Sequence, residues 1–442
     1  MKKRIVAATL CVTLLLGFVA CSKTTADPQI QSKNLMEDLK TPTPGEENPE
    51  GKTEPVPTKG VEDSKEVHTP AEYKNQYPIS GFGVKLLQQT LESAEADENV
   101  LVSPLSVLLA LYMTANGADG TTKEQMLDVL GDNLNDYLKA YQESLSQGTD
   151  YKLHIANGIW FREEEFLKVQ EDFLRANQQY FNAALYTAPF NDITCKEINN
   201  WVKENTDGMI EGILDEISSD AVLYLINALS FDAKWQKPYN EHSVREDSVF
   251  TKEDGTRQKA TLMYSEESAY MEDESATGFL KYYKGRKYAF VALLPREGVT
   301  VAEYVEGLNE EDLQKLFANA KQTTVNAAIP KFETEYDILL NDVLTQMGIK
   351  DAFSFADADF SKMATSERGN IYISRVLHKT FISVDESGTR AGAVTAVGMP
   401  DSCALMPGEV YNVYLDRPFV YMLIDCETNQ PFFIGTMMDV EQ

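Results

Sequence analysis

Side chains that could carry out nucleophilic or metal-assisted chemistry are sparse in this chain. Its four histidines stand at positions 68, 154, 242 and 378, far apart in the sequence. There is no H-E-x-x-H zinc motif, no G-x-S-x-G nucleophile elbow, no S-x-x-K pair, no P-loop and no G-x-G-x-x-G motif. Cysteine and histidine are also too few for a structural zinc site. We therefore expect no metal ion and no cofactor, and we predict that the chain is not an enzyme.

One catalytic hypothesis can still be written from these residues. A serine hydrolase of the cell envelope could use His378 as a base for Ser103 or Ser106. However, both serines flank the start of a predicted buried helix, and no acidic residue is indicated that would orient His378. The competing interpretation is that these are buried polar residues that hydrogen-bond to one another.

The segment from Glu386 to Val397, read E-S-G-T-R-A-G-A-V-T-A-V, has a different potential. Almost all of its residues after Glu386 are small or β-branched, apart from Arg390. One parity of the alternation holds Thr389, Ala391, Ala393, Thr395 and Val397, a set that could enter a tightly packed interior as one face of a strand. Its glycines equally suit an exposed loop. A segment that can be either loop or buried strand indicates a conformational switch.

The rest of the chain reads as one continuous α+β domain over residues 74–442. Ser103 and Pro104 predict a helix N-cap and first helical position, followed by a helix over 105–113 that is apolar nearly all round. A second helix is predicted over 197–208. Buried strands are predicted over 221–231, 288–294, 420–424 and 432–438. Asn227 interrupts the first of these strands and would need hydrogen-bond partners.

The N-terminus predicts export and anchoring. A basic start at residues 2–4 and an apolar run over 5–20 form a signal peptide over residues 1–20. Ala20 stands immediately before Cys21, as in bacterial lipoprotein signals, so we expect Cys21 to carry lipid and to hold the protein on the cell envelope. Simple secretion is the alternative. Residues 21–73 predict a disordered Pro-rich linker, because 22–72 holds seven of the 17 prolines and no aromatic residue.

The net charge of the chain limits the classes of partner that it could bind. The formal net charge of −29 argues against nucleic acid, whose phosphates would be repelled. Hydrophobic content of 43% is ordinary for a folded domain. With Cys11 lost in the signal and Cys21 lipidated, three cysteines remain, Cys195, Cys403 and Cys426. An odd number does not form a disulfide framework.

Several separated motifs together resemble the serpins, a family of serine-protease inhibitors. They occur from about residue 75 to the C-terminus, in the family's order. These motifs are N-V-L-V-S-P-L-S-V from Asn99, I-N-N-W-V-K-E-N-T-D-G-M-I from Ile198, L-I-N-A-L-S-F-D-A-K-W from Leu225, P-K-F from Pro330, H-K-T-F-I-S-V-D-E-S-G-T from His378 and L-D-R-P-F from Leu415.

The resemblance implies an α+β fold of three β-sheets and about nine helices with an exposed reactive-centre loop. A target protease would cleave this loop, and the cleaved loop would insert into the main sheet and trap the acyl-enzyme. It implies a loop hinge at Glu386, Gly388, Thr389, Ala391, Ala393 and Thr395. It further implies a buried polar "shutter" formed by Ser103, Ser106, Asn227 and His378, and a "breach" at Trp235, Lys331 and Glu386, where Lys331 would pair with Glu386 and restrain the hinge.

The bond that the protease would cleave is bounded but not fixed. Counting forward from Glu386 places it after Ser402, whereas counting back from Pro418 places it near Met406 or Pro407. The candidates are Ser402, Cys403, Leu405 and Met406, within Asp401 to Pro407. Because no Lys or Arg occurs between Arg390 and Arg417, we expect elastase-like, subtilisin-like or papain-like targets rather than trypsin-like ones. A monomer is expected, and a non-inhibitory serpin acting as a binding or carrier module is the alternative.

Overall fold

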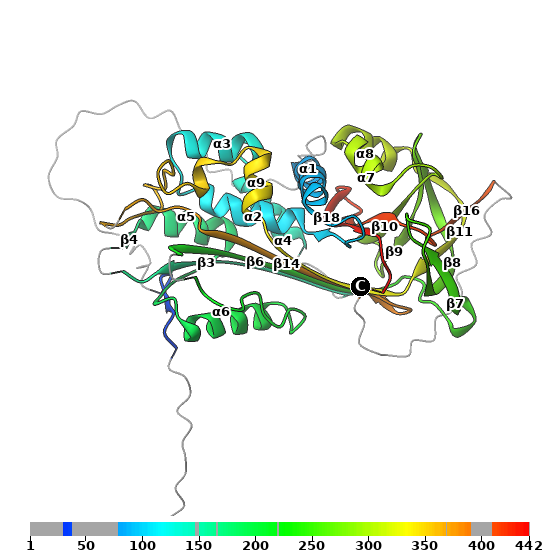
Figure 1. Cartoon of the computed structure of the whole chain (residues 1–442), viewed down its shortest axis with the longest axis horizontal. Coiled ribbons are helices and arrows are strands. Elements are labelled where there is room, and N and C mark those ends of the chain that lie inside the picture. The colour runs from blue at the N-terminus through cyan, green and yellow to red at the C-terminus, as the bar shows by residue number, and fades with distance from the viewer. Residues whose placement is uncertain are drawn as a thin grey trace, which may run out of the picture.

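The computed structural model describes residues 30–37, 78–145, 150–164, 167–218, 221–367, 369–389 and 409–441. These residues form three β-sheets and nine α-helices, the α+β class that was predicted (Figure 1). The helices are α1 (Pro78–Ser93), α2 (Pro104–Ala115), α3 (Gly120–Leu130), α4 (Asn135–Leu145), α5 (Glu171–Phe181), α6 (Asp192–Asn205), α7 (Val301–Gly307), α8 (Glu310–Ala318) and α9 (Asn341–Met347). None of the helices in the described ranges is long and apolar enough to cross a membrane.

The seven-stranded sheet positions the predicted functional residues. Its order is β1 (Lys33–Asn34), β5 (Ala184–Ala188), β3 (Tyr151–Arg162), β6 (Leu223–Lys234), β15 (Gly388–Thr389), β14 (Arg375–Val384) and β12 (Phe332–Leu339). At one end, β6 and β14 pair directly and in parallel, with Asn227 opposite His378. At the other end they separate, and the two residues of β15 lie between them, antiparallel to both. The sheet is therefore already opened at that end by the first residues of the predicted loop.

The nine-stranded sheet carries the far end of that loop. Its order is β16 (Val410–Tyr414), β11 (Lys321–Pro330), β8 (Arg257–Glu272), β9 (Ala276–Tyr282), β10 (Tyr288–Pro295), β17 (Phe419–Asp425), β18 (Gln430–Met437) and β2 (Leu101–Val102), with β7 (Val244–Thr251) paired to β8. A third sheet joins β13 (Ala364–Thr365) to β4 (Lys168–Val169). Thr389 and Val410, the nearest strand residues on either side of the reactive-loop region, thus belong to different sheets.

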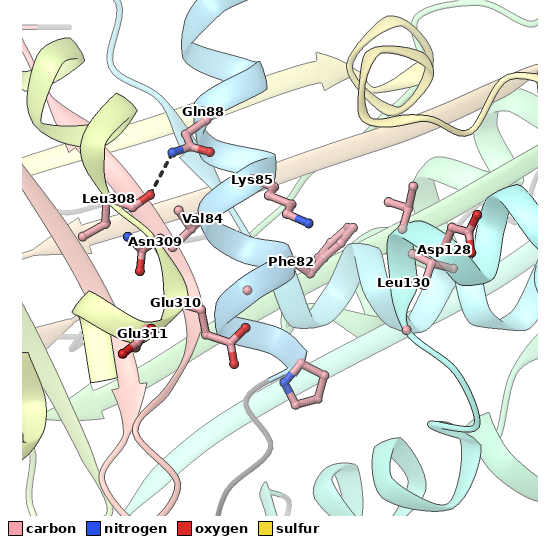
Figure 2. A pocket seen from close by; sticks show the side chains of 14 residues that line it. Phe82, Val84, Lys85, Gln88, Asp128, Leu130, Leu308, Asn309, Glu310 and Glu311 are labelled. Carbon is pink, nitrogen blue, oxygen red and sulfur yellow. Dashed lines mark hydrogen bonds between the residues drawn. The ribbon is translucent and has the colours of Figure 1, made fainter. Parts of the chain in front are cut away.

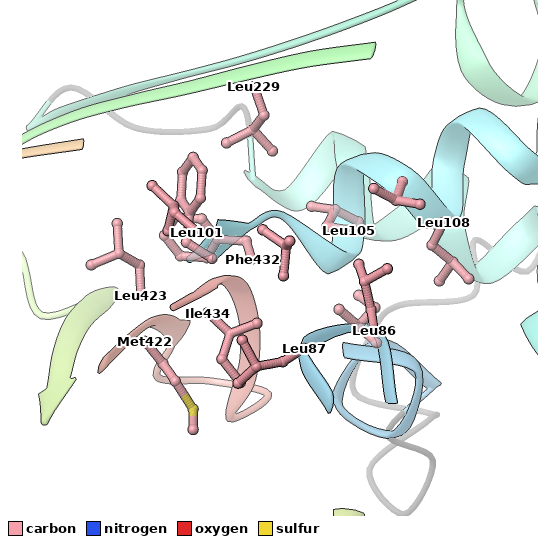
Figure 3. Close-up of a cluster of buried hydrophobic side chains, with 14 of the residues drawn as sticks. Leu86, Leu87, Leu101, Leu105, Leu108, Leu229, Met422, Leu423, Phe432 and Ile434 are labelled. Carbon is pink, nitrogen blue, oxygen red and sulfur yellow. The ribbon is translucent and has the colours of Figure 1, made fainter. Parts of the chain in front are cut away.

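The core lies between the two large sheets and around α2. Every residue of α2 is buried, which the apolar run predicted. Leu101, Leu105, Leu229, Phe432 and Ile434 come together there from α2 and from strands of both sheets (Figure 3). Helix α6 lies on the opposite face of the seven-stranded sheet from α2 (Figure 1) and covers a second apolar cluster that includes Ile198, Val202 and Ile226.

Local signals located these elements, although several boundaries differ from the prediction, most clearly at α6 and β6. Ser103 caps α2, and its side chain accepts the Ser106 N–H. Helix α6 begins at Asp192 rather than 197, because the Asn191 side chain accepts the N–H groups of Ile193 and Thr194 and caps the helix there. Strand β6 extends to Lys234, beyond the apolar run, because its last residues pair with β3 and β15.

Residues 30–37 differ from the predicted disordered linker, in which they fall. Lys33 and Asn34 form β1 on the outer edge of β5. The backbone N–H groups of Gln31 and Ser32 donate to the Glu197 carboxylate of α6 at 2.5 and 2.9 Å. Leu35 and Met36 pack against the core. Two adjacent apolar residues and an available sheet edge are enough to order this short piece, although the surrounding composition is polar and Pro-rich.

Candidate functional site: the hinge and its breach

The hinge residues Gly388 and Thr389 occupy the opening between β6 and β14. Thr389 is 1% exposed and lies opposite Ala233 on one side and Val384 on the other. Its hydroxyl is hydrogen-bonded to the Tyr283 hydroxyl. A Cβ at Gly388 would collide with the carbonyl oxygen of Ala233 and stand 2.8 Å from Cα of Lys234. Only glycine therefore allows the hinge to enter the sheet this closely.

Trp235, predicted for the breach, holds the turn that leads into the hinge. Its backbone N–H donates to the Ser387 carbonyl at 2.9 Å, and its indole N–H donates to the Asp385 carbonyl at 2.8 Å. The ring stacks on Tyr283 with centroids 4.4 Å apart and an interplanar angle of 13°. Trp235 and Tyr283 are both buried and in contact. One stacked aromatic pair therefore binds both the turn, through Trp235, and the Thr389 hydroxyl, through Tyr283.

Lys331 and Glu386 lie together at the outer side of the breach. The Lys331 ammonium donates to both carboxylate oxygens of Glu386, at 3.1 and 3.0 Å. Burial raises the pKa of the Glu386 carboxyl, but hydrogen bonds from its own backbone and from Lys331 outweigh this and bring the pKa below its ordinary value. Both side chains are substantially exposed, at 48% and 34%, so the pair contributes about 0–1 kcal/mol and restrains the hinge only weakly.

A buried ion pair that the sequence analysis did not identify packs against Trp235. The Lys281 ammonium, 1% exposed, donates to the Glu267 carboxylate at 2.8 Å. It also lies 5.3 Å from the centroid of a Trp235 ring and 4.2 Å from that of Tyr239. The Tyr239 backbone N–H in turn donates to the Glu386 carbonyl at 2.9 Å. No local pattern marks Lys281 and Glu267, since they lie on different strands and meet only after the sheet has formed.

The predicted shutter residues meet beneath the part of the sheet where β6 and β14 still pair. Asn227 Nδ2 donates to the Ser106 carbonyl at 2.7 Å and to Asn157 Oδ1 at 2.6 Å, while its Oδ1 accepts the Ser106 hydroxyl. The Ser103 hydroxyl donates to the Phe432 carbonyl at 2.7 Å, and its backbone N–H donates to His378 Nε2 at 3.0 Å. These groups bridge α2 to β3, β6, β14 and β18. Asn157 is the member that sequence reasoning missed.

The same geometry excludes the hydrolase hypothesis. Ser103, Ser106 and His378 are each 0% exposed, so a substrate cannot reach them. His378 accepts a backbone N–H rather than a serine hydroxyl, and the Ser103 hydroxyl is engaged by a carbonyl. A general base must reach the proton of its nucleophile, and this one does not. The cluster is a structural polar network.

His378 predicts a specific dependence of stability on pH. Burial lowers the pKa of His378 to about 3, well below the value of about 6.5 expected when the chain is unfolded. Its contribution to stability is therefore complete above pH 6.5 and is lost as the pH falls toward 3, by about 3 kcal/mol between pH 7 and pH 4.5. In a His378→Gln variant, residue 378 cannot titrate. Between pH 7 and pH 4.5 the free energy of unfolding, measured by chemical denaturation, should therefore fall by that much less than in the wild type. Identical pH profiles for the two proteins would contradict this assignment.

Other predicted site residues lie outside the described residues. These are the later hinge positions Ala391, Ala393 and Thr395, the cleavage candidates Ser402, Cys403, Leu405 and Met406, and the lipidation residue Cys21. The described ranges contain no cluster of His, Cys, Asp and Glu that could hold a metal ion.

A surface pocket of about 460 Å³ lies apart from the breach, between α1, the end of α3 and the start of α8 (Figure 2). Gln88 donates to the Leu308 carbonyl at its rim. Burial raises the pKa of Glu310, whose carboxylate lies against Gly81. Its lining belongs to none of the predicted hinge, breach or shutter sets.

Comparison with known proteins agrees with this geometry. The serpin (serine protease inhibitor) family model matches residues 78–440. Neuroserpin of Homo sapiens is 30% identical over 385 residues, covering 82% of this chain and 91% of that protein. Leukocyte elastase inhibitor A of Mus musculus is 29% identical over 376 residues, covering 80% of this chain and 96% of that protein.

A solved structure is similar over nearly the whole chain. The thermophilic serpin tengpin in its native state is 43% identical, with a TM-score of 0.80, and the match covers 93% of this chain and 100% of that one. The predicted fold, with three sheets and about nine helices, is confirmed by this likeness. Because the family match spans most of its length, the chain belongs to the serpin family of serine-protease inhibitors.

Proposed function

We propose that this protein is a suicide inhibitor of endopeptidases that acts by inserting its cleaved loop into the seven-stranded sheet. The observation that carries the proposal is the position of Gly388 and Thr389, which already pair with both β6 and β14 at the open end of the sheet. Each further residue that enters would extend β15 toward the shutter. The six residue steps along β6 from Ala233 to Asn227 correspond to about 20 Å of strand.

Insertion requires that β6 and β14 separate along this path. The two strands now pair directly from Arg375 opposite Tyr224 to Lys379 opposite Ala228. A new strand inserted there would replace the one β6–β14 ladder with two ladders, one to β6 and one to β14. The gain is reached readily only after the loop is cut, because both ends of the intact loop are held, at Thr389 and at Val410, in different sheets. The shutter hydrogen bonds across α2 and the sheet delay the opening and make the uncut state kinetically stable.

The loop sequence supports the choice of target. Small or β-branched residues at Ala391, Ala393 and Thr395 can follow Thr389 into the interior without unpaired charge. Within Asp401 to Pro407 the residues that could precede the cleaved bond are Ser402, Cys403, Leu405 and Met406, and none is basic. We assign the targets to elastase-like, subtilisin-like or papain-like proteases. The signal sequence and Cys21 further support a lipid-anchored protein of the bacterial cell envelope.

The test is formation of a covalent complex. The purified protein is incubated with pancreatic elastase, subtilisin, papain and trypsin, and the products are separated by denaturing gel electrophoresis. We expect an SDS-resistant complex with at least one of the first three proteases and none with trypsin. Recovery of only the cleaved chain from every incubation would contradict inhibition and favour the alternative of a non-inhibitory binding module. Thyroxine-binding globulin, 23% identical with a TM-score of 0.73, shares the fold alone.

A further inference from the structure

Strand β16 follows closely in the sequence after the candidate cleavage bonds. It begins at Val410, three residues after Pro407, so any bond cleaved between 401 and 407 lies within about 30 Å of it along an extended chain. A protease domain of about 250 residues is about 45 Å across. A protease engaged on the loop is therefore large enough to reach this edge of the nine-stranded sheet. Among the described strands, β16 has a single neighbour, β11, and its other edge is unpaired.

The outward face of β16 displays large side chains that a free surface rarely exposes together. Val410, Asn412 and Tyr414 alternate onto one face, and Val413 points to the core. Val410 is 56% exposed and Tyr414 is 37% exposed. They are two of the five large hydrophobic side chains exposed in the described part of the chain, and only three residues lie between them. Tyrosine and arginine are the residue types that most often dominate binding energy at protein interfaces.

Neighbouring strands hold these side chains in place. The Tyr414 ring meets Tyr264 of β8 edge to face, with centroids 5.8 Å apart. The Arg245 guanidinium of β7 lies 4.4 Å from the centroid of Tyr264. On the next rung, Asn326 of β11 donates to Asn412 Oδ1 at 2.8 Å. Side chains already fixed by such contacts lose little rotational freedom when a partner binds, which favours affinity.

The unsatisfied groups of this face indicate what it would bind. Asn412 Oδ1 accepts from Asn326 Nδ2 and from the Tyr414 hydroxyl, whereas no hydrogen bond among the described residues involves Asn412 Nδ2 or Asn326 Oδ1. The pair therefore offers a donor and an acceptor, the complement of a peptide group. Arg245 forms no ion pair with any described residue and remains available for a carboxylate.

We propose that the β16 face, formed by Arg245, Tyr264, Asn326, Asn412 and Tyr414, is a docking surface for the target protease in addition to the cleaved loop. The partner chemistry is a surface polypeptide loop that carries a carboxylate. This inference rests on the proposed inhibitory function. The docked face accelerates capture of the protease and has no part in sheet opening, because none of its strands borders the gap between β6 and β14.

The experiment measures the second-order rate constant for covalent complex formation with whichever protease of the panel reacts. The variants are Asn412→Ala/Tyr414→Ala and Arg245→Ala, and the control is Leu339→Ala, which truncates a 44% exposed side chain on β12. We expect the double variant to react about tenfold more slowly and the control to match the wild type. The stoichiometry of inhibition and the melting temperature should stay unchanged. The Arg245→Ala deficit should shrink at high salt.

The outcomes separate this inference from the proposed function. If the wild type forms no complex with any protease, the proposed function fails and this inference fails with it. If the wild type forms the complex and the variants react within twofold of it, only the docking surface is overturned. A slower variant that also melts earlier or inhibits with a changed stoichiometry would likewise overturn it. So would self-association of the wild type that the double variant abolishes, because the face would then belong to a second copy of the chain.

Discussion

Replacing Thr389 with arginine is expected to convert the inhibitor into a substrate. Thr389 is 1% exposed between β6 and β14, and its hydroxyl is bonded to Tyr283. An arginine there would have to be buried without a counter-charge, at a cost of several kcal/mol. Burial raises the pKa of Tyr283 well above its ordinary value, so its phenol stays neutral and cannot serve as that counter-charge.

The consequence is kinetic. After cleavage, insertion of the loop competes with hydrolysis of the acyl-enzyme, and each 1.4 kcal/mol added to the insertion barrier slows it about tenfold. We expect at least about ten molecules of the Thr389→Arg variant to be cleaved for each protease molecule inactivated. This stoichiometry is measured by titrating the residual protease activity. The matched control, Thr389→Ser, keeps a small hydroxyl side chain and should stay within about twofold of the wild type. Unaltered stoichiometry in the arginine variant would mean that position 389 need not enter the sheet.

Replacing Asn227 with alanine should give the largest loss of stability. Asn227 satisfies the Ser106 carbonyl, the Ser106 hydroxyl and Asn157 at once, and it is 1% exposed. Removal leaves several buried polar groups without partners, at about 1–3 kcal/mol each. We expect a loss of about 3 kcal/mol or more in chemical unfolding. On warming, the variant should also convert faster to a loop-inserted form that no longer inhibits.

A control separates this effect from loss of an ordinary asparagine. Asn319 is exposed just after α8, so Asn319→Ala should change stability by no more than about 0.5 kcal/mol. If Asn227→Ala unfolds like the Asn319→Ala control, the buried network is not what restrains the sheet.

The sequence predicts those parts of this structure that are encoded locally. Ser103 and Pro104 marked the start of α2, because capping and a fixed φ act within one turn. The apolar run over 221–231 marked β6, since a strand buried on both faces needs such a run. The roles of Asn227, His378 and Trp235 came only from the resemblance to serpins, which a local pattern could not supply.

Features that depend on long-range register were not predictable. Tyr283 meets Thr389 across 106 positions of sequence, and Asn157 meets Asn227 across 70. Neither contact has a local signal, because each depends on which strands become neighbours. The same holds for β1, whose place on β5 depends on pairing Lys33 with Thr187, 154 positions later in the sequence. That Gly388 and Thr389 already lie within the sheet, rather than entering only after cleavage, is likewise a tertiary property of the folded chain.

The central claim, that the cut loop becomes a strand of the seven-stranded sheet, is tested most directly by the melting temperature before and after cleavage. The loop is cut once with a protease that cleaves the protein without being trapped by it. Mass spectrometry verifies that the cleaved bond lies between Asp401 and Pro407. Because a new central strand adds ladder hydrogen bonds on both sides, we predict a rise of about 10 °C or more in the melting temperature of the cleaved protein. An unchanged or lower melting temperature would show that the loop does not insert, and would contradict the account.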